Sequence, residues 1–138
     1  MMDDGIGIYV VEELMRENTK SNLHFVIGES DIDYCLEQID GATLVIIIDA
    51  VVIGKKPGEV TVFSISELSE QQSLNISPHN LHLFNVLSQQ REWMKGVIIG
   101  IEPFEICFHI GLSQTLEQKF KQIHHNVKCR FDKIMMEI

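Results

Sequence analysis

The stretch TLVIIIDAVV, residues 43–52, constrains the fold of this chain more than any other segment. A continuous run of β-branched side chains is typical of a strand buried on both faces, as in a parallel sheet covered by helices. A second run of this kind, GVIIGIEP at residues 96–103, predicts another central strand. Between them, EVTVFSI at residues 59–65 alternates polar and apolar side chains after a turn at residues 54–58. This alternation predicts a half-buried strand that pairs antiparallel at an edge.

Helical patterns lie before, between and after these strands. From about Asp4, apolar residues recur at helical spacing on one face, namely Ile8, Val11, Leu14 and Met15. A last helix is predicted to begin near Ser113, with an apolar stripe of Leu116, Phe120, Ile123, Val127, Phe131 and Ile134. Further segments are predicted as a strand at residues 23–27 and as helices at residues 31–39 and 79–90. Alternating strands and helices favour a single α/β domain over residues 1–138, with a mostly parallel sheet.

Net charge, hydropathy and cysteine spacing argue against several classes of partner and of protein. The net charge of −9 argues against nucleic acid or an anionic membrane surface, because both require clustered Lys and Arg. The longest apolar run, Leu44–Ile48, is too short to span a bilayer. The three cysteines are widely spaced, which favours reduced thiols in a cytoplasmic protein over a disulfide framework or a zinc knuckle.

Acidic and imidazole side chains stand at the predicted junctions between strands and helices. Ligands of α/β sheets bind beyond the carboxyl ends of the strands, and Asp49 interrupts its apolar run at such an end. His79 begins a helix after a Ser-Pro turn, and His82 follows one helical turn later. Asp3 and Asp4 precede the first helix. Each also has a structural interpretation, since a carboxylate here can cap a helix or turn and a histidine can be partly buried.

Asp4, Asp49 and His79 come from three separate segments and together suggest one site. Two carboxylates and an imidazole suit a divalent transition metal. Glu29 and Ser30 follow a predicted strand end and are expected to line the same cleft. The convergence of these segments is a hypothesis about tertiary structure, which spacing alone does not establish.

The remaining chemical signals in the sequence are weak. Cys107 and His109 form only a two-ligand fragment, for which a structural role is favoured. His124 and His125 on the last helix are predicted to form a solvated edge. The sequence contains no Gly-rich phosphate loop, nucleophile elbow or H-E-x-x-H motif. The missing phosphate loop argues against a generic flavodoxin-like ligand-binding domain.

Four ordered stretches resemble the hydrogenase maturation endopeptidases, which process the large subunit of nickel–iron hydrogenases. The order and spacing match across nearly the whole chain. The stretches are DDGIG at 3–7, IIIDAVVIGKKPG at 46–58, SPHNLHLFNVL at 77–87 and HIGLS at 109–113.

The resemblance implies a fold, a reaction and a site. The fold would be a phosphorylase/hydrolase-like three-layer α/β sandwich, with a twisted, mostly parallel sheet between helices on both faces. The reaction would be that of a metal-dependent, aspartic-type endopeptidase that removes the C-terminal extension of the hydrogenase large-subunit precursor after nickel insertion. Carried over by motif, the metal-binding and catalytic residues are Asp4, Asp49 and His79. The nickel would be supplied by the precursor.

Three features depart from the family pattern. Gly28-Glu29-Ser30 replaces a Gly-Gly-Thr-like stretch near the expected substrate, and Phe108 replaces a proline. The first strand and the Gly-Asn turn that normally precede the DDG motif are missing, so the chain is expected to be N-terminally truncated, or Met1 or Met2 to be an internal methionine of a longer protein. The alternative function is therefore a truncated, non-catalytic homologue that acts as a metal- or partner-binding module.

Overall fold

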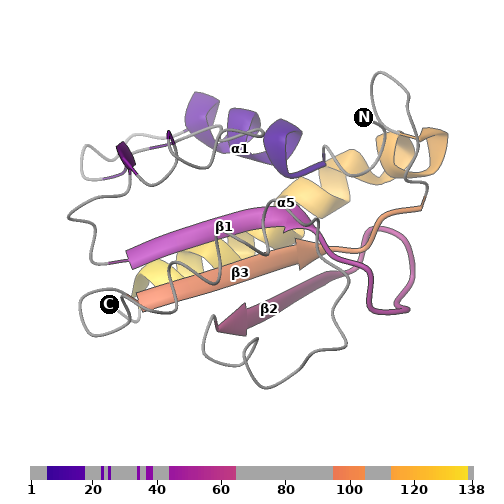
Figure 1. Cartoon of the computed structure of the whole chain (residues 1–138). Coiled ribbons are helices and arrows are strands. Elements are labelled where there is room, and N and C mark those ends of the chain that lie inside the picture. The colour runs from indigo at the N-terminus through magenta and orange to yellow at the C-terminus, as the bar shows by residue number, and fades with distance from the viewer. Residues whose placement is uncertain are drawn as a thin grey trace.

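A computed structural model describes two helices, three strands and the loop that joins two of the strands. The elements follow the order α1 (Ile6–Glu17), β1 (Leu44–Ala50), β2 (Val60–Ser64), β3 (Lys95–Ile101) and α5 (Gln114–Met136) (Figure 1). The structure describes residues 6–17, 23, 25, 34, 37–38, 44–64, 95–104 and 113–136.

The three strands form one sheet in the order β1-β3-β2. β1 runs parallel to β3, with Leu44 opposite Lys95 and Ala50 opposite Ile101. β2 runs antiparallel, as predicted, but its partner is β3 and not β1, the strand to which the short turn joins it. The connection turns through Gly54 and Gly58, whose φ angles of 84° and 89° suit glycine because it lacks a Cβ atom. The described sheet is thus mixed, with one parallel and one antiparallel pair.

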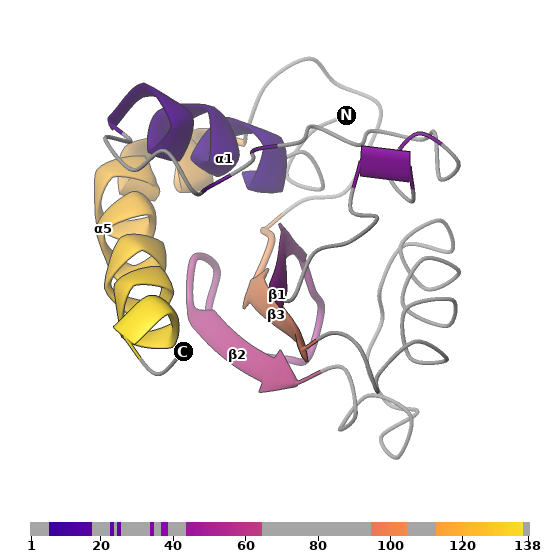
Figure 2. The ribbon, with the colours of Figure 1, turned by 90° about the vertical axis from the view of Figure 1, so that its left-hand side faces the viewer.

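Both described helices pack on one side of the sheet (Figure 2). α1 lies against β1, and α5 contacts β2, β3 and α1. Together they form one helical layer of the predicted sandwich. The helix predicted at residues 79–90 lies outside the described residues.

The core lies between this helical layer and β3. The apolar stripe predicted for α5 is confirmed, because Leu116, Ile123, Val127 and Ile134 are buried and the two phenylalanines pack against them. Ser113 caps this helix, with its Oγ accepting a hydrogen bond from the Leu116 N–H at 3.3 Å. Full burial of such a side chain contributes roughly 1.5–3 kcal/mol before entropy is subtracted.

The predicted buried face of α1 is wrong for most of its residues. Leu14 is buried as expected, but Met15 is 43% exposed and Ile8 and Val11 are only partly buried. The face that packs on the core comprises Ile6, Gly7, Val10 and Leu14. The prediction considered only apolar side chains and so placed the buried face wrongly. Gly7 has no side chain, and this allows α1 to approach β1 closely on the face that contains Gly7.

Two shorter predictions are tested only at single residues. Tyr34, Glu37 and Gln38 are helical, in agreement with the helix predicted at residues 31–39. Leu23 and Phe25 are not part of a strand, although Phe25 packs against the core. The other residues of these two segments lie outside the described part of the chain.

Candidate functional site

Asp49 lies where the sequence predicted it, near the carboxyl end of β1. It stands opposite Gly100 of β3 in the parallel register and is half-buried. Parallel strands end at the same edge of a sheet, so the residues after β1 and after β3 meet there. Asp49 is therefore a carboxylate at the edge where sheets of this class bind ligands.

The first turn of α1 packs directly on the backbone beside Asp49. A Cβ atom at Gly7 would lie 2.1 Å from the Ile48 carbonyl oxygen and 3.1 Å from the Asp49 Cα. Only glycine permits this approach without a shift of the helix or the strand. The N-terminal end of a helix carries partial positive charge, which favours carboxylates in this region. The DDGIG motif thus brings the start of α1 to the end of β1 through its second glycine.

The other predicted site residues lie outside the described part of the chain. These are Asp3, Asp4, Glu29, Ser30, His79, His82, Cys107 and His109. Among the residues that the structure does describe, no group of three His, Cys, Asp or Glu side chains could hold a metal ion. Of the predicted triad, only Asp49 belongs to that part, so this result does not test the triad.

Glu102 is a carboxylate that sequence reasoning missed. It follows β3 directly and is only 5% exposed. Its Oε1 accepts hydrogen bonds from the backbone N–H groups of Ile53 at 3.0 Å and Lys55 at 2.8 Å. Its own backbone bonds to Gly58 and Glu59, at 2.7 Å and 2.9 Å. One buried residue therefore holds both ends of the loop between β1 and β2.

A sequence signal for Glu102 existed. A charged residue directly after a buried β-branched run is costly unless its charge is satisfied, which is the argument that singled out Asp49. The sequence GIEP presents the same pattern as IIIDA, at the end of the neighbouring parallel strand. The Glu102 carboxylate accepts hydrogen bonds from backbone N–H groups.

The prediction that His124 and His125 form a solvated edge is wrong for His124. Its side chain is only 15% exposed and stacks on Phe120, with ring centroids 6.5 Å apart. Its Nε2 lies 3.6 Å from a carboxylate oxygen of Glu17 and has no hydrogen-bond partner among the described residues. His125 is exposed as expected. His124 is covered because α1 ends beside this part of α5, a contact that one helix pattern does not predict.

Comparison with known families gives a match over most of the chain. The sequence model of a family described as hydrogenase maturation protease matches residues 8–128. The chain is 31% identical to the hydrogenase 2 maturation protease of Escherichia coli K12 over 123 residues, which cover 85% of this chain and 75% of that protein. It is 26% identical to the hydrogenase 3 maturation protease of the same strain over 133 residues, covering 93% and 82% of the two chains.

Solved structures show the same similarity in three dimensions. The hydrogenase maturating endopeptidase HybD from E. coli superposes with a TM-score of 0.79 at 25% identity, covering 96% of this chain and 86% of that chain. The [NiFe] hydrogenase maturation protease HybD from Thermococcus kodakarensis gives a TM-score of 0.70 at 25% identity, with coverages of 93% and 89%. In the described residues, no helix is both long and apolar enough to cross a membrane.

Proposed function

Because the chain belongs to the hydrogenase maturation protease family, we propose that it cleaves a hydrogenase large-subunit precursor at a centre formed by Asp4, Asp49 and His79. Members of this family process the C-terminus of the hydrogenase large subunit. The substrate would be the precursor with nickel already inserted. The family match over residues 8–128 supports a single protease domain over residues 1–138. The widely spaced cysteines support a cytoplasmic location.

The packing of Gly7 against Ile48 and Asp49 is the observation that carries this proposal. Asp4 precedes Gly7 by three residues, and three residues of extended chain span at most about 11 Å. This short separation in sequence supports the proposal that Asp4 lies near the carboxyl end of β1. This supports the pairing of its carboxylate with Asp49, which the shared motifs suggested.

The donor set suits the substrate's nickel. Carboxylate and imidazole groups are suitable ligands for divalent transition metals, and each of the three proposed ligands comes from a different segment. In this proposal the three side chains contact nickel in the precursor and so fix the scissile peptide bond relative to the protease. A bound metal can polarise a carbonyl group and acidify a water molecule, and a carboxylate can accept a proton in peptide hydrolysis.

The test uses purified chain with two forms of the large-subunit precursor, nickel-loaded and nickel-free. Intact-mass spectrometry would show loss of the C-terminal extension. We expect cleavage of the nickel-loaded form alone, and no cleavage by Asp4→Ala. Equal cleavage of both forms would contradict nickel recognition. Binding of the precursor without any cleavage would instead support the non-catalytic module.

A further inference from the structure

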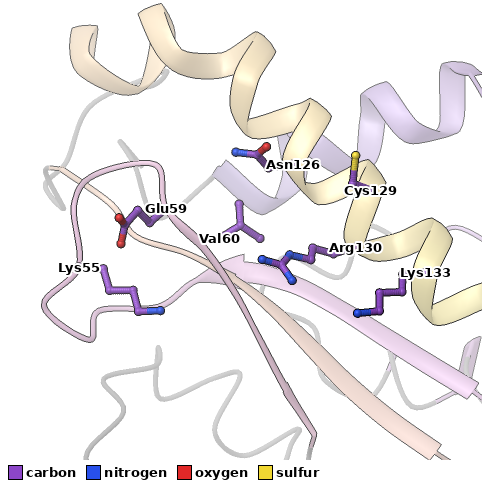
Figure 3. Close-up of a pocket in the computed structure, with 7 residues that line it drawn as sticks. All are labelled: Lys55, Glu59, Val60, Asn126, Cys129, Arg130 and Lys133. Carbon is purple, nitrogen blue, oxygen red and sulfur yellow. The ribbon is translucent and has the colours of Figure 1, made fainter.

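A basic pocket lies between the β1–β2 loop and α5 (Figure 3). Its volume is about 590 Å³, which falls within the range of roughly 300–1,000 Å³ typical of ligand sites. Arg130 and Lys133 extend from α5 toward the strand side of the pocket, and Lys55 comes from the loop (Figure 3). The complete lining is Lys55, Glu59, Val60, Asn126, Cys129, Arg130 and Lys133.

The charge of this pocket is opposite to that of the chain. Three cations and one carboxylate line it, whereas the whole chain has a net charge of −9. Within the part of the chain that the structure describes, the ion pairs use Arg16, His124 and Lys128, and no carboxylate pairs with the cations of the pocket. A hollow lined by more cations than carboxylates raises the local concentration of anions.

The loop side of the pocket is held in place by a buried group. The Lys55 backbone N–H donates to the carboxylate of Glu102, which is almost fully buried. Outside the pocket lining, Lys119 Nζ donates to the Pro57 carbonyl oxygen at 3.2 Å and so ties the loop to α5. A wall fixed before the ligand arrives lowers the entropic cost of binding.

The polar groups on α5 form a stripe rather than a single point. Asn126, Arg130 and Lys133 recur at spacings of four and three residues, so they share one face over a rise of about 10 Å. Same-face side chains of an extended peptide recur about every 6.6–6.8 Å. Two acidic side chains spaced by two residues fit within the length of this stripe, whereas a single phosphate group would occupy only part of it.

From this charge and shape we infer that the basic pocket binds an extended acidic segment of the hydrogenase large-subunit precursor, separate from the bond that is cleaved. The inference rests on the proposed substrate. Lys55 follows Asp49 by six residues and belongs to the loop that leaves the carboxyl end of β1. One long polypeptide can therefore reach both places, and the pocket would add affinity for the precursor without taking part in the chemistry.

Binding is tested first with a fluorescent peptide that alternates Asp with Ser, measured by anisotropy. We expect binding that weakens strongly in about 1 M NaCl, where the screening length is about 3 Å. Arg130→Glu with Lys133→Glu should abolish it. Lys121→Glu is the matched control, because this exposed lysine of the same helix does not line the pocket. Equal binding by the double variant, or displacement by inorganic phosphate as readily as by unlabelled peptide, would overturn the inference.

The second measurement separates the pocket from the reacting centre. With nickel-loaded precursor, we expect the double variant to raise KM about tenfold or more, with kcat within about twofold, because lost attraction at a remote contact acts on binding. Lys121→Glu should leave both parameters unchanged. An unchanged KM in the double variant would refute a precursor site. If the wild-type chain cleaves nothing yet binds the precursor through this pocket, the proposed catalysis fails and the pocket assignment stands.

Discussion

The backbone of Gly7 lies so close to the carbonyl oxygen of Ile48 that a Cβ atom at position 7 would stand only 2.1 Å from it. The two contacting residues belong to a helix and a strand, α1 and β1, and are 41 positions apart in the sequence. Both contacting groups are backbone, so no side chain can rotate away to relieve a clash. This contact sets the position of α1 relative to the end of β1.

Gly7→Ala should therefore destabilise the fold. The added methyl group forces α1 away from β1, and such overpacking typically costs about 1–3 kcal/mol, with this backbone contact at the upper end. Urea unfolding followed by circular dichroism measures the loss. In Gly54→Ala, the new Cβ would meet nothing within 4 Å, so its cost reflects only the positive φ angle. A smaller loss for Gly7→Ala than for Gly54→Ala would contradict this interpretation.

Loss of the Glu102 carboxylate should destabilise the loop between β1 and β2. Glu102→Ala leaves the N–H groups of Ile53 and Lys55 without their acceptor, at a cost of about 1–3 kcal/mol for each group that water does not reach. Glu102→Gln keeps a carbonyl oxygen and should retain most of the stability. Chemical unfolding of both variants makes the comparison, and equal losses would show that the hydrogen bonds are not the cause.

Substitution of Asp49 or His79 should remove activity and leave the fold intact. We expect Asp49→Ala and His79→Ala each to lower the rate of precursor cleavage by at least about 10²–10⁴-fold, the scale of a lost acid–base group. Mass spectrometry of nickel-loaded precursor measures the rate, and circular dichroism reports the fold. Asp132→Ala, at an exposed position on α5, is the control. Normal cleavage by either site variant would refute its assignment.

Replacement of His124 by an apolar side chain should stabilise the contact between α1 and α5. In the described part of the chain the buried Nε2 finds no hydrogen-bond partner, and an unsatisfied buried polar atom costs about 1–3 kcal/mol. His124→Leu removes that atom and keeps an apolar group beside Phe120. The melting temperature should rise by a few degrees. A fall would mean that the nearby Glu17 carboxylate contributes more than the unsatisfied nitrogen costs.

Local patterns in the sequence determined much of the fold. The uninterrupted β-branched runs predicted β1 and β3, the alternation of EVTVFSI predicted the antiparallel β2, and the stripe after Ser113 predicted α5. These predictions succeeded because burial on one or both faces requires a characteristic pattern of apolar residues within each element. Asp49 was placed at a strand end by the same logic. Four ordered motifs also indicated the family, which the comparisons confirmed.

Only the tertiary structure decided what depends on contacts between distant segments. The buried face of α1 follows from the close approach of Gly7 to Ile48, and the burial of His124 follows from the end of α1 beside α5. Glu102 reaches backbone groups 47 and 49 residues away. The basic pocket exists because a loop and a helix face each other. The two partners of such a contact lie in different segments, so the sequence pattern of either segment alone does not predict the contact.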